Sequence, residues 1–359
     1  SIITSLAEER KLKRTISRKA PVIQMEFLSR LVRGQVAIST ITEEDLAFMD
    51  VHFRKDAFCT IMVDIDNGNR FMRSDSEKEW ALLRFVIGNL GAELLGEDGY
   101  SIELELNRLL FLINLESASE NTSFLQSFVD RMKELLDGWY RTQVTLAVSR
   151  IHSGMQAIPE CYNESSMAMD YKLLRGRYTV FYYDEVMHMK HVAYYYPPTM
   201  ESQLIHYAKS GSREQLEKLL LQIYEINFQS RGLSPEMGKS LFYSLINTYL
   251  KWVHTFPMEE HPIPIETDPA KLLAGCATAD EMFDTVRQLY VTLCERANEE
   301  RSQHSDKLYE QIRDYVAANV TDSNLSLASI ADQFKMNASY LSTFFKKQSG
   351  ENLSDYILH

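Results

Sequence analysis

A predicted helix near the C-terminus, over residues 338–348, separates polar and apolar side chains on two faces. The polar face carries small hydroxyl groups and a cation: Ser339, Ser342, Thr343 and Lys346. The apolar face, which should pack inward, consists of Leu341, Phe344 and Phe345. Small polar side chains can bond base edges in the major groove of DNA, and ammonium groups can bond phosphates. The pattern therefore indicates a DNA-reading helix, and the alternative is an ordinary helical hairpin with a solvated face.

Three preceding elements must position this helix. An amphipathic helix comes first and carries its apolar residues at helical spacing: Leu308, Ile312, Tyr315 and Val316. Ser326 is then a suitable N-cap for a short helix whose apolar face consists of Leu327, Ile330, Ala331 and Phe334. A tight break at residues 335–337 leads into the polar-faced helix, which ends before Gly350. Two short helices joined by a tight turn are the geometry of a helix-turn-helix.

The amino-acid sequence of this segment resembles the first half of the AraC/XylS family DNA-binding domain. The matching pieces are LSLASIA and, after it, NASYLSTFFKKQSGENLSDYI. The resemblance implies that small hydroxyl side chains contact bases and that the lysines contact phosphates. The DNA-binding residues that we expect are Asn337, Ser339, Tyr340, Ser342, Thr343, Lys346 and Lys347. The family joins two such helix pairs by a long helix, whereas this chain stops at His359 and begins at Ser1 without Met. We therefore expect a domain truncated at its C-terminus, which binds DNA through the complete parent protein.

The charge balance argues against a general binder of polyanions, because the formal net charge is −12. From residue 301 onward six cations stand against seven anions, so this half-domain should bind DNA poorly by itself. No apolar run reaches transmembrane length and no signal peptide is present, so we expect a cytoplasmic protein or the cytoplasmic part of a membrane-anchored parent. Four widely spaced cysteines favour reduced and mostly buried thiols: Cys59, Cys161, Cys276 and Cys294.

Residues 55–190 alternate between predicted strands and helices and include one adjacent strand pair, over 101–106 and 108–115. This order predicts an α/β sandwich with a mixed sheet. With MVDIDNGNRF, VTLAVSRIHSG and FYYDEV in sequence, it resembles a GGDEF (nucleotide cyclase-like) domain. The resemblance places Asp64 and Asp66 at the acidic pair of the first strand.

The loop that defines the GGDEF family is absent. Where a Gly-Gly-acidic-Glu-Phe turn should join the strand pair, the chain reads LELNRL over residues 104–109, without the glycines and without the second metal carboxylate. Asp64 and Asp66 alone make a poor Mg²⁺ site. His188 and His191 could share a metal ion, but a surface pair is the simpler interpretation. We therefore predict no catalytic residue, no cofactor, no metal site and no enzymatic activity.

Taken together, the chain should be α+β and multidomain: a cyclase-like α/β sandwich with a mixed sheet, an all-α segment and a partial helix-turn-helix domain. The expected domains are a helical connector over 1–50, a degenerate GGDEF-like domain over 51–190, a helical linker over 191–303 and the first half of the DNA-binding domain over 304–359. Residues 301–305 should form a polar hinge, and the helix around Arg10 to Arg33 should mediate self-association or relay.

The function expected is that of a sequence-specific transcriptional regulator, the cytoplasmic signalling portion of a larger sensor-regulator. Its partners would be DNA, a second copy in a homodimer and an upstream sensor or receiver domain, with no small-molecule substrate. Two alternatives stay open: a nucleotide-sensing or diguanylate-cyclase-like enzyme domain, and a protein-interaction or dimerisation scaffold.

Overall fold

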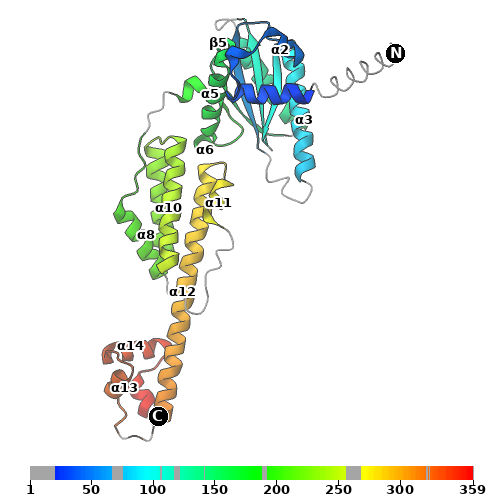
Figure 1. The fold of residues 1–359 in the computed structure, drawn as a ribbon. Coiled ribbons are helices and arrows are strands. Elements are labelled where there is room, and N and C mark those ends of the chain that lie inside the picture. Colours follow the sequence, from blue (N-terminus) through cyan, green and yellow to red (C-terminus); the bar gives the residue numbers. More distant parts are fainter. Residues whose placement is uncertain are drawn as a thin grey trace. The chain divides into compact units, whose positions relative to one another are not determined.

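The computed structural model describes residues 21–66, 76–105, 107–116, 122–140, 142–187, 192–255, 268–320, 322 and 324–358 (Figure 1). The chain divides into two units. Unit 1 is drawn from Ser1–Tyr195, Glu225–Tyr243 and Ile265–Phe283, and unit 2 from Tyr196–Tyr224, Ser244–Pro264 and Asp284–His359. The long helices α10 (Pro235–Thr255) and α12 (Ala279–Ala318) contribute residues to both units.

Unit 1 is built on a six-stranded sheet in the order β2-β3-β1-β4-β6, with β5 paired to β1. The strands are β1 (Ala57–Ile65), β2 (Gly99–Glu105), β3 (Arg108–Leu115), β4 (Val144–Val148), β5 (His152–Ser153) and β6 (Val180–Tyr182). All pairs are antiparallel except β4 with β6, which is parallel. The predicted α+β class with a mixed sheet is therefore confirmed.

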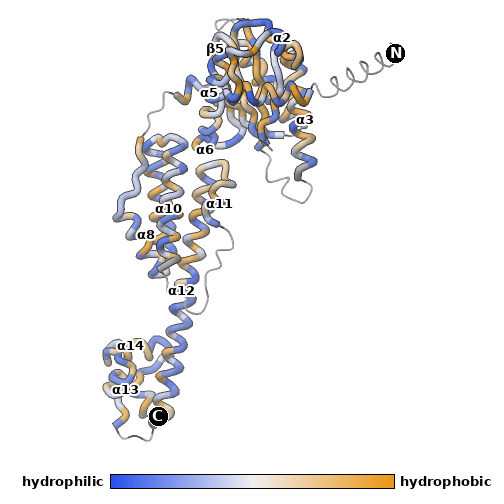
Figure 2. Tube along the Cα trace, viewed as in Figure 1, coloured by the Kyte–Doolittle hydropathy of each residue, from blue (hydrophilic) through white to orange (hydrophobic). Residues whose placement is uncertain are grey.

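Helices cover both faces of this sheet. Because successive strand residues point to opposite faces, Cys59 and Ile61 of β1 pack with α3 (Ser76–Leu95) and α4 (Thr122–Leu135). Phe58 and Met62 pack on the other face, in the cluster that includes α5 (Ile158–Asp170). Every residue of β1 is buried, and Figure 2 draws the sheet region of unit 1 largely in hydrophobic colours. Such a strand, buried on both faces, reads in sequence as a continuous apolar run.

Shorter elements connect these layers. They are η1 (Ile38–Thr40), α2 (Glu43–Phe48), η2 (Gly96–Asp98), η3 (Leu136–Tyr140), η4 (Met155–Ala157), α6 (Lys172–Arg175), α7 (Tyr183–Val186), η5 (Glu225–Ser230) and α11 (Pro269–Ala274). Residues 21–32 are helical, and Leu28, Leu31 and Val32 are buried in the same cluster as Phe58. The expected boundary at residue 51 stays a prediction, although these residues before it contribute to the core of unit 1. The charged run of the expected connector, over residues 8–19, lies outside the described residues.

Unit 2 begins with α8 (Pro198–Ser210) and α9 (Arg213–Tyr224), and it also includes parts of α10 and α12. Its core is apolar, with Leu204, Leu216 and Leu220 buried. The phenol of Tyr290 is buried too and donates a hydrogen bond to the carbonyl oxygen of Leu245, 2.8 Å away. Among the described residues, no helix has the length and apolar content required to cross a bilayer.

The hinge that we predicted at residues 301–305 is wrong, because α12 runs unbroken from Ala279 to Ala318. Polar residues such as Glu, Arg and Gln are good helix formers, so polarity alone does not end a helix. One face of this stretch also bonds to neighbouring helices. Asn298 and Arg301 donate to the carbonyl oxygens of Gly211 and Lys209, which end α8, and Ser305 accepts from Gln348.

Candidate nucleic-acid interface and acidic pair

Two short helices, α13 (Leu327–Gln333) and α14 (Ala338–Ser349), pack on the end of α12, and α15 (Leu353–Leu358) follows them. Their shared core is small and apolar. It consists of Ile312, Val316, Ile330, Ala331, Leu341, Phe345 and Leu353. The helices thus have the order and spacing that the sequence predicts for this segment.

A side-chain cap marks the N-terminus of each of the two helices. Ser326 is the N-cap of α13, as predicted, and its hydroxyl accepts a hydrogen bond from the backbone N–H of Ser329 at 3.2 Å. Asn337 is the N-cap of α14, and its side chain accepts from the N–H of Ser339 at 2.8 Å. Between them, Lys335 has a left-handed backbone with φ of 51°. Gly350, with φ of 84°, ends α14.

The faces of α14 largely follow the prediction. Leu341 and Phe345 are fully buried. Phe344, which we expected to be buried with them, is half-buried and stacks on Tyr340, with ring centroids 6.3 Å apart. One residue corresponds to about 100° around a helix, so Phe344 lies at the edge of the buried arc. Five predicted DNA-contact side chains besides Asn337 are exposed, and Ser342 is half-buried. The five are Ser339, Tyr340, Thr343, Lys346 and Lys347.

Sequence reasoning missed a groove between α14 and α12. It has a volume of about 810 Å³ and lies wholly within unit 2. Tyr340, Thr343 and Lys347 form one wall, and α12 contributes Arg301 and His304 to the other. The predicted hinge at residues 301–305 separated these two segments, so we did not expect them to lie side by side.

The acidic pair lies at the end of β1, in unit 1, and is buried. The ammonium of Lys172, itself 7% exposed, lies 3.1 Å from Oδ2 of Asp64 and 2.5 Å from Oδ1 of Asp66. A lysine therefore occupies the space between the two carboxylates. Sequence reasoning did not single out Lys172, because it is separated from Asp66 by more than a hundred residues and has no motif around it.

Neutral donors complete the coordination of the two carboxylates. Asn107 donates to Oδ1 of Asp64 at 2.6 Å, and the hydroxyl of Thr145 donates to Oδ2 of Asp66 at 2.6 Å. Asn107 belongs to the turn that replaces the glycine-rich loop; its neighbour Leu106 lies outside the described residues. Because these oxygens already accept hydrogen bonds, a metal ion would have to displace side chains to bind them.

A cavity of about 300 Å³ adjoins this pair within unit 1. Its cations have acidic neighbours: Lys239 lies 3.3 Å from Asp170, and Arg108 lies 3.5 Å from Asp64. The positive charges around this cavity are therefore neutralised by carboxylates of the same unit. The histidine pair considered from the sequence, His188 and His191, lies outside the described residues.

Comparisons with known proteins give a relative in sequence and partial likenesses in structure. No family model matches the chain. The chain is 21% identical over 357 residues to the uncharacterized HTH-type transcriptional regulator YtdP of Bacillus subtilis (strain 168); the match covers 96% of this chain and 45% of the relative. The chain thus spans less than half the length of that protein.

Two solved structures are similar to about a third of the chain. One is the active GGEEF domain of a diguanylate cyclase from Vibrio cholerae, with 16% identity, a TM-score of 0.29 and coverage of 36% of this chain and 83% of that chain. The other is the GGDEF domain of DgcB from Caulobacter crescentus in complex with c-di-GMP, with 8% identity, a TM-score of 0.31 and coverage of 36% and 79%.

Proposed function

We propose that the chain is the signalling and DNA-reading part of an AraC-type transcriptional regulator, and that α14 enters the major groove. The observation that carries the proposal is the exposed polar face of α14, opposite the buried Leu341 and Phe345. Side chains on that face can approach base edges without disturbing the core. Similarity to an HTH-type regulator over nearly the whole chain supports the same function.

Each predicted residue has a role that fits its surroundings. Ser339 and Ser342 offer hydroxyls to base edges, and Lys346 and Lys347 offer ammonium groups to phosphates. The hydroxyl of Thr343 donates to the carbonyl oxygen of Ser339 at 3.0 Å, so what it offers a base is its methyl group and an acceptor. A threonine methyl is suited to contact the methyl of thymine.

Asn337 and Tyr340 act differently from the hydroxyl residues. Asn337 uses its side chain to cap α14, and thereby sets the position of the first helical turn. Tyr340 is 60% exposed beside the groove and presents its phenol to the DNA backbone. In this proposal both residues position α14 on the duplex more than they select bases.

The parent protein works as a homodimer that receives a signal from an upstream sensor or receiver domain. The signal shifts the population of states in which two readers are presented to DNA. A single copy of the segment from residue 301 onward, with six cations and seven anions, binds DNA weakly, since phosphate contacts supply much of the affinity. Pairing two copies is therefore part of the mechanism.

The test uses the chain fused to a heterologous dimerisation domain, so that two readers are presented together. Selection from a random DNA library should enrich one sequence. Thr343→Gln should change the enriched base at one position, because each mismatch costs about 1–3 kcal/mol. Ala328→Gln, at an exposed position of α13, is the control and should leave the preference unchanged. Enrichment of no sequence, or of the same sequence with Thr343→Gln, contradicts the proposal.

The alternative function, a nucleotide-sensing or cyclase-like enzyme, has less support. Its acidic pair is bridged by Lys172, and both carboxylates accept further hydrogen bonds from Asn107 and Thr145. Catalysis with Mg²⁺ needs these oxygens for the ion. We therefore retain a regulatory role for unit 1 and no enzymatic one.

A further inference from the structure

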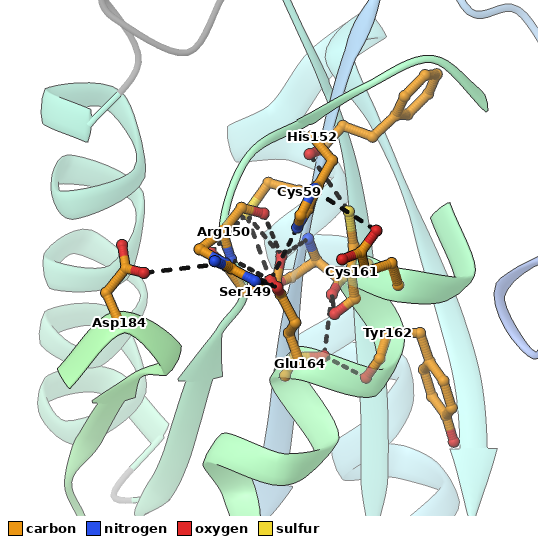
Figure 3. A network of polar contacts seen from close by, with 12 residues as sticks. Cys59, Ser149, Arg150, His152, Cys161, Tyr162, Glu164 and Asp184 are labelled. Carbon is orange, nitrogen blue, oxygen red and sulfur yellow. Dashed lines mark hydrogen bonds and ion pairs between the residues drawn. The ribbon is translucent and has the colours of Figure 1, made fainter. Parts of the chain in front are cut away.

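A third cluster lies in unit 1, at the opposite end of β1 from the acidic pair. His152 of β5 and two glutamates of α5, Glu160 and Glu164, each place one potential ligand atom within 4.8 Å of the others. Glu160 and Glu164 are four residues apart on α5, and this spacing puts both side chains on the same face of a helix. Figure 3 shows His152, Arg150 and Glu164 within one network of polar contacts.

The separations suit a metal ion. Nε2 of His152 lies 3.1 Å from Oε2 of Glu164, and one ligand atom from each of the three side chains lies within 4.8 Å of the other two. In a tetrahedral site with bonds of about 2.0–2.2 Å, ligand atoms are separated by roughly 3.3–3.6 Å. The side chain of Glu160 is 59% exposed, so it can turn by the small amount needed to complete the site.

Glu164 is held in place before any ligand arrives. Its side chain is 4% exposed, and Oε1 accepts hydrogen bonds from the guanidinium of Arg150, with Nε at 2.8 Å. Oε2 accepts from the backbone N–H of Arg150 at 2.9 Å and faces His152. Hydrogen bonds of this kind orient ligating carboxylates in known metal sites.

The burial of a ring nitrogen also favours a metal ion at this cluster. Nε2 of His152 is inaccessible to solvent and has no hydrogen-bond partner, although it faces Glu164. A buried nitrogen without a partner is unfavourable, since burial removes the hydrogen bond that water would supply. A bound cation would satisfy this nitrogen.

We propose that His152, Glu160 and Glu164 bind one divalent transition-metal ion of the Zn²⁺ type, with water as the fourth ligand. One imidazole and two carboxylates form a ligand set that Zn²⁺ accepts in proteins, and the mixture of nitrogen and oxygen disfavours Mg²⁺ and Ca²⁺. The two carboxylates carry two negative charges against the single positive charge of Arg150, so the cluster attracts a cation. The exposed Glu160 provides the entry path.

The site has a structural consequence that does not depend on the DNA-reading function. His152 pairs with β1 through β5, whereas both glutamates belong to α5. A metal ion would therefore cross-link β5, at the N-terminal end of the central strand β1, to helix α5. Zinc availability would then set the stability of unit 1.

Calorimetric titration of the whole chain with Zn²⁺ should show one site per chain, and Zn²⁺ should raise the Tm of unit 1. Glu160→Gln should weaken binding by about tenfold or more, because it removes a ligand without touching the core. His152→Gln should do the same, with far-UV circular dichroism as the check on folding. Glu79→Gln, at an exposed position of α3, is the matched control and should bind Zn²⁺ as the unaltered chain does.

Co²⁺ provides a second readout, since a tetrahedral site gives visible absorption that Glu160→Gln should abolish. Equal Zn²⁺ affinity in the unaltered chain and in Glu160→Gln would overturn the proposal. So would the absence of any Zn²⁺-dependent rise in Tm. A changed base preference in Thr343→Gln affects neither result, so the metal site and the DNA-reading helix are tested separately.

Discussion

The ammonium group of Lys172 lies 2.5 Å from Oδ1 of Asp66, and it also reaches Oδ2 of Asp64 at 3.1 Å. The chain therefore supplies its own cation at the end of β1. Both carboxylates are buried, so their negative charge needs a partner within the protein. A buried carboxylate pair without this lysine would bind a cation from solution or take up a proton.

Removing this lysine should unfold unit 1 more easily. Lys172→Met leaves the buried Asp66 without a counter-charge and leaves Asp64 with only Arg108, 3.5 Å away, so we expect a loss of about 3–5 kcal/mol in the free energy of unfolding. Millimolar Mg²⁺ should restore part of that stability in the variant and have no effect on the unaltered chain. Urea denaturation followed by circular dichroism measures both quantities.

Lys239→Met is the matched control for that experiment. Lys239 pairs with Asp170 at 3.3 Å, but both side chains are 43% exposed, so the change should stay within about 1 kcal/mol. Equal losses of unfolding free energy in the two variants would show that the stabilisation by Lys172 does not depend on the burial of its ion pairs.

Unit 1 should not cyclise GTP. Mg²⁺ would have to compete with Lys172 for Asp64 and Asp66, and the glycine-rich turn is replaced by residues that include Asn107. We expect no cyclic dinucleotide when the chain is incubated with GTP and Mg²⁺ and the mixture is separated by chromatography. A product that scales with protein concentration would refute this.

Lys347→Ala should weaken DNA binding for all sequences alike in the dimerised fusion. Each phosphate contact contributes about one unit to the dependence of log K on log salt, so the slope should fall by about one per copy. Binding assays between low and physiological salt measure the slope. Lys271→Ala, on α11 in unit 1, is the control and should not alter it. A changed base preference in Lys347→Ala would assign the residue to base reading.

Lys335→Gly should stabilise the α13–α14 pair. Lys335 has φ of 51°, a region that costs a residue with a side chain about 1–2 kcal/mol relative to glycine. Glycine also makes the unfolded chain more flexible, so the net gain should be about 1 kcal/mol or less. Slower hydrogen exchange at the amides of Leu341 and Phe345 would report the gain. Lys335→Ala should show none, since alanine keeps the strained backbone.

Two N-terminal deletions separate self-association from core packing. If the segment before Arg33 mediates a homodimer, deletion of residues 1–20 should change the mass measured by light scattering from that of a dimer to that of a monomer. Deletion of residues 1–33 should also lower the Tm, because it removes Leu28, Leu31 and Val32 from the core of unit 1. An unchanged oligomeric state in both deletions would contradict a role in self-association.

Periodicity predicted most elements closely. The strands predicted over residues 101–106 and 108–115 are β2, Gly99–Glu105, and β3, Arg108–Leu115. The residues of β2 alternate between polar and apolar from Ser101 onward, and β3 is a continuous apolar run; both patterns are typical of strands. The N-cap at Ser326 was predictable for a similar reason, since it depends on only three neighbouring residues.

What the sequence could not predict depends on contacts between distant segments. Lys172 meets Asp66 across more than a hundred residues, and nothing in its local sequence indicates a partner. The spacing of Glu160 and Glu164 is visible in the sequence, but the third member, His152, comes from a separate strand. The hinge prediction failed because a polar helix that bonds to its neighbours looks, in sequence, like a loop.

The unbroken course of α12 restricts how this protein can gain or lose residues during evolution. Asn298 and Arg301 bind the end of α8, and Ser305 binds α14 from the same side of the helix. Figure 2 draws this stretch of α12 in hydrophilic colours. An insertion of one residue between Arg301 and Ser305 would turn the following segment, together with the helices packed on it, by about 100° relative to the contacts with α8. Related chains should therefore differ in length at this point only by whole helical turns, three or four residues at a time.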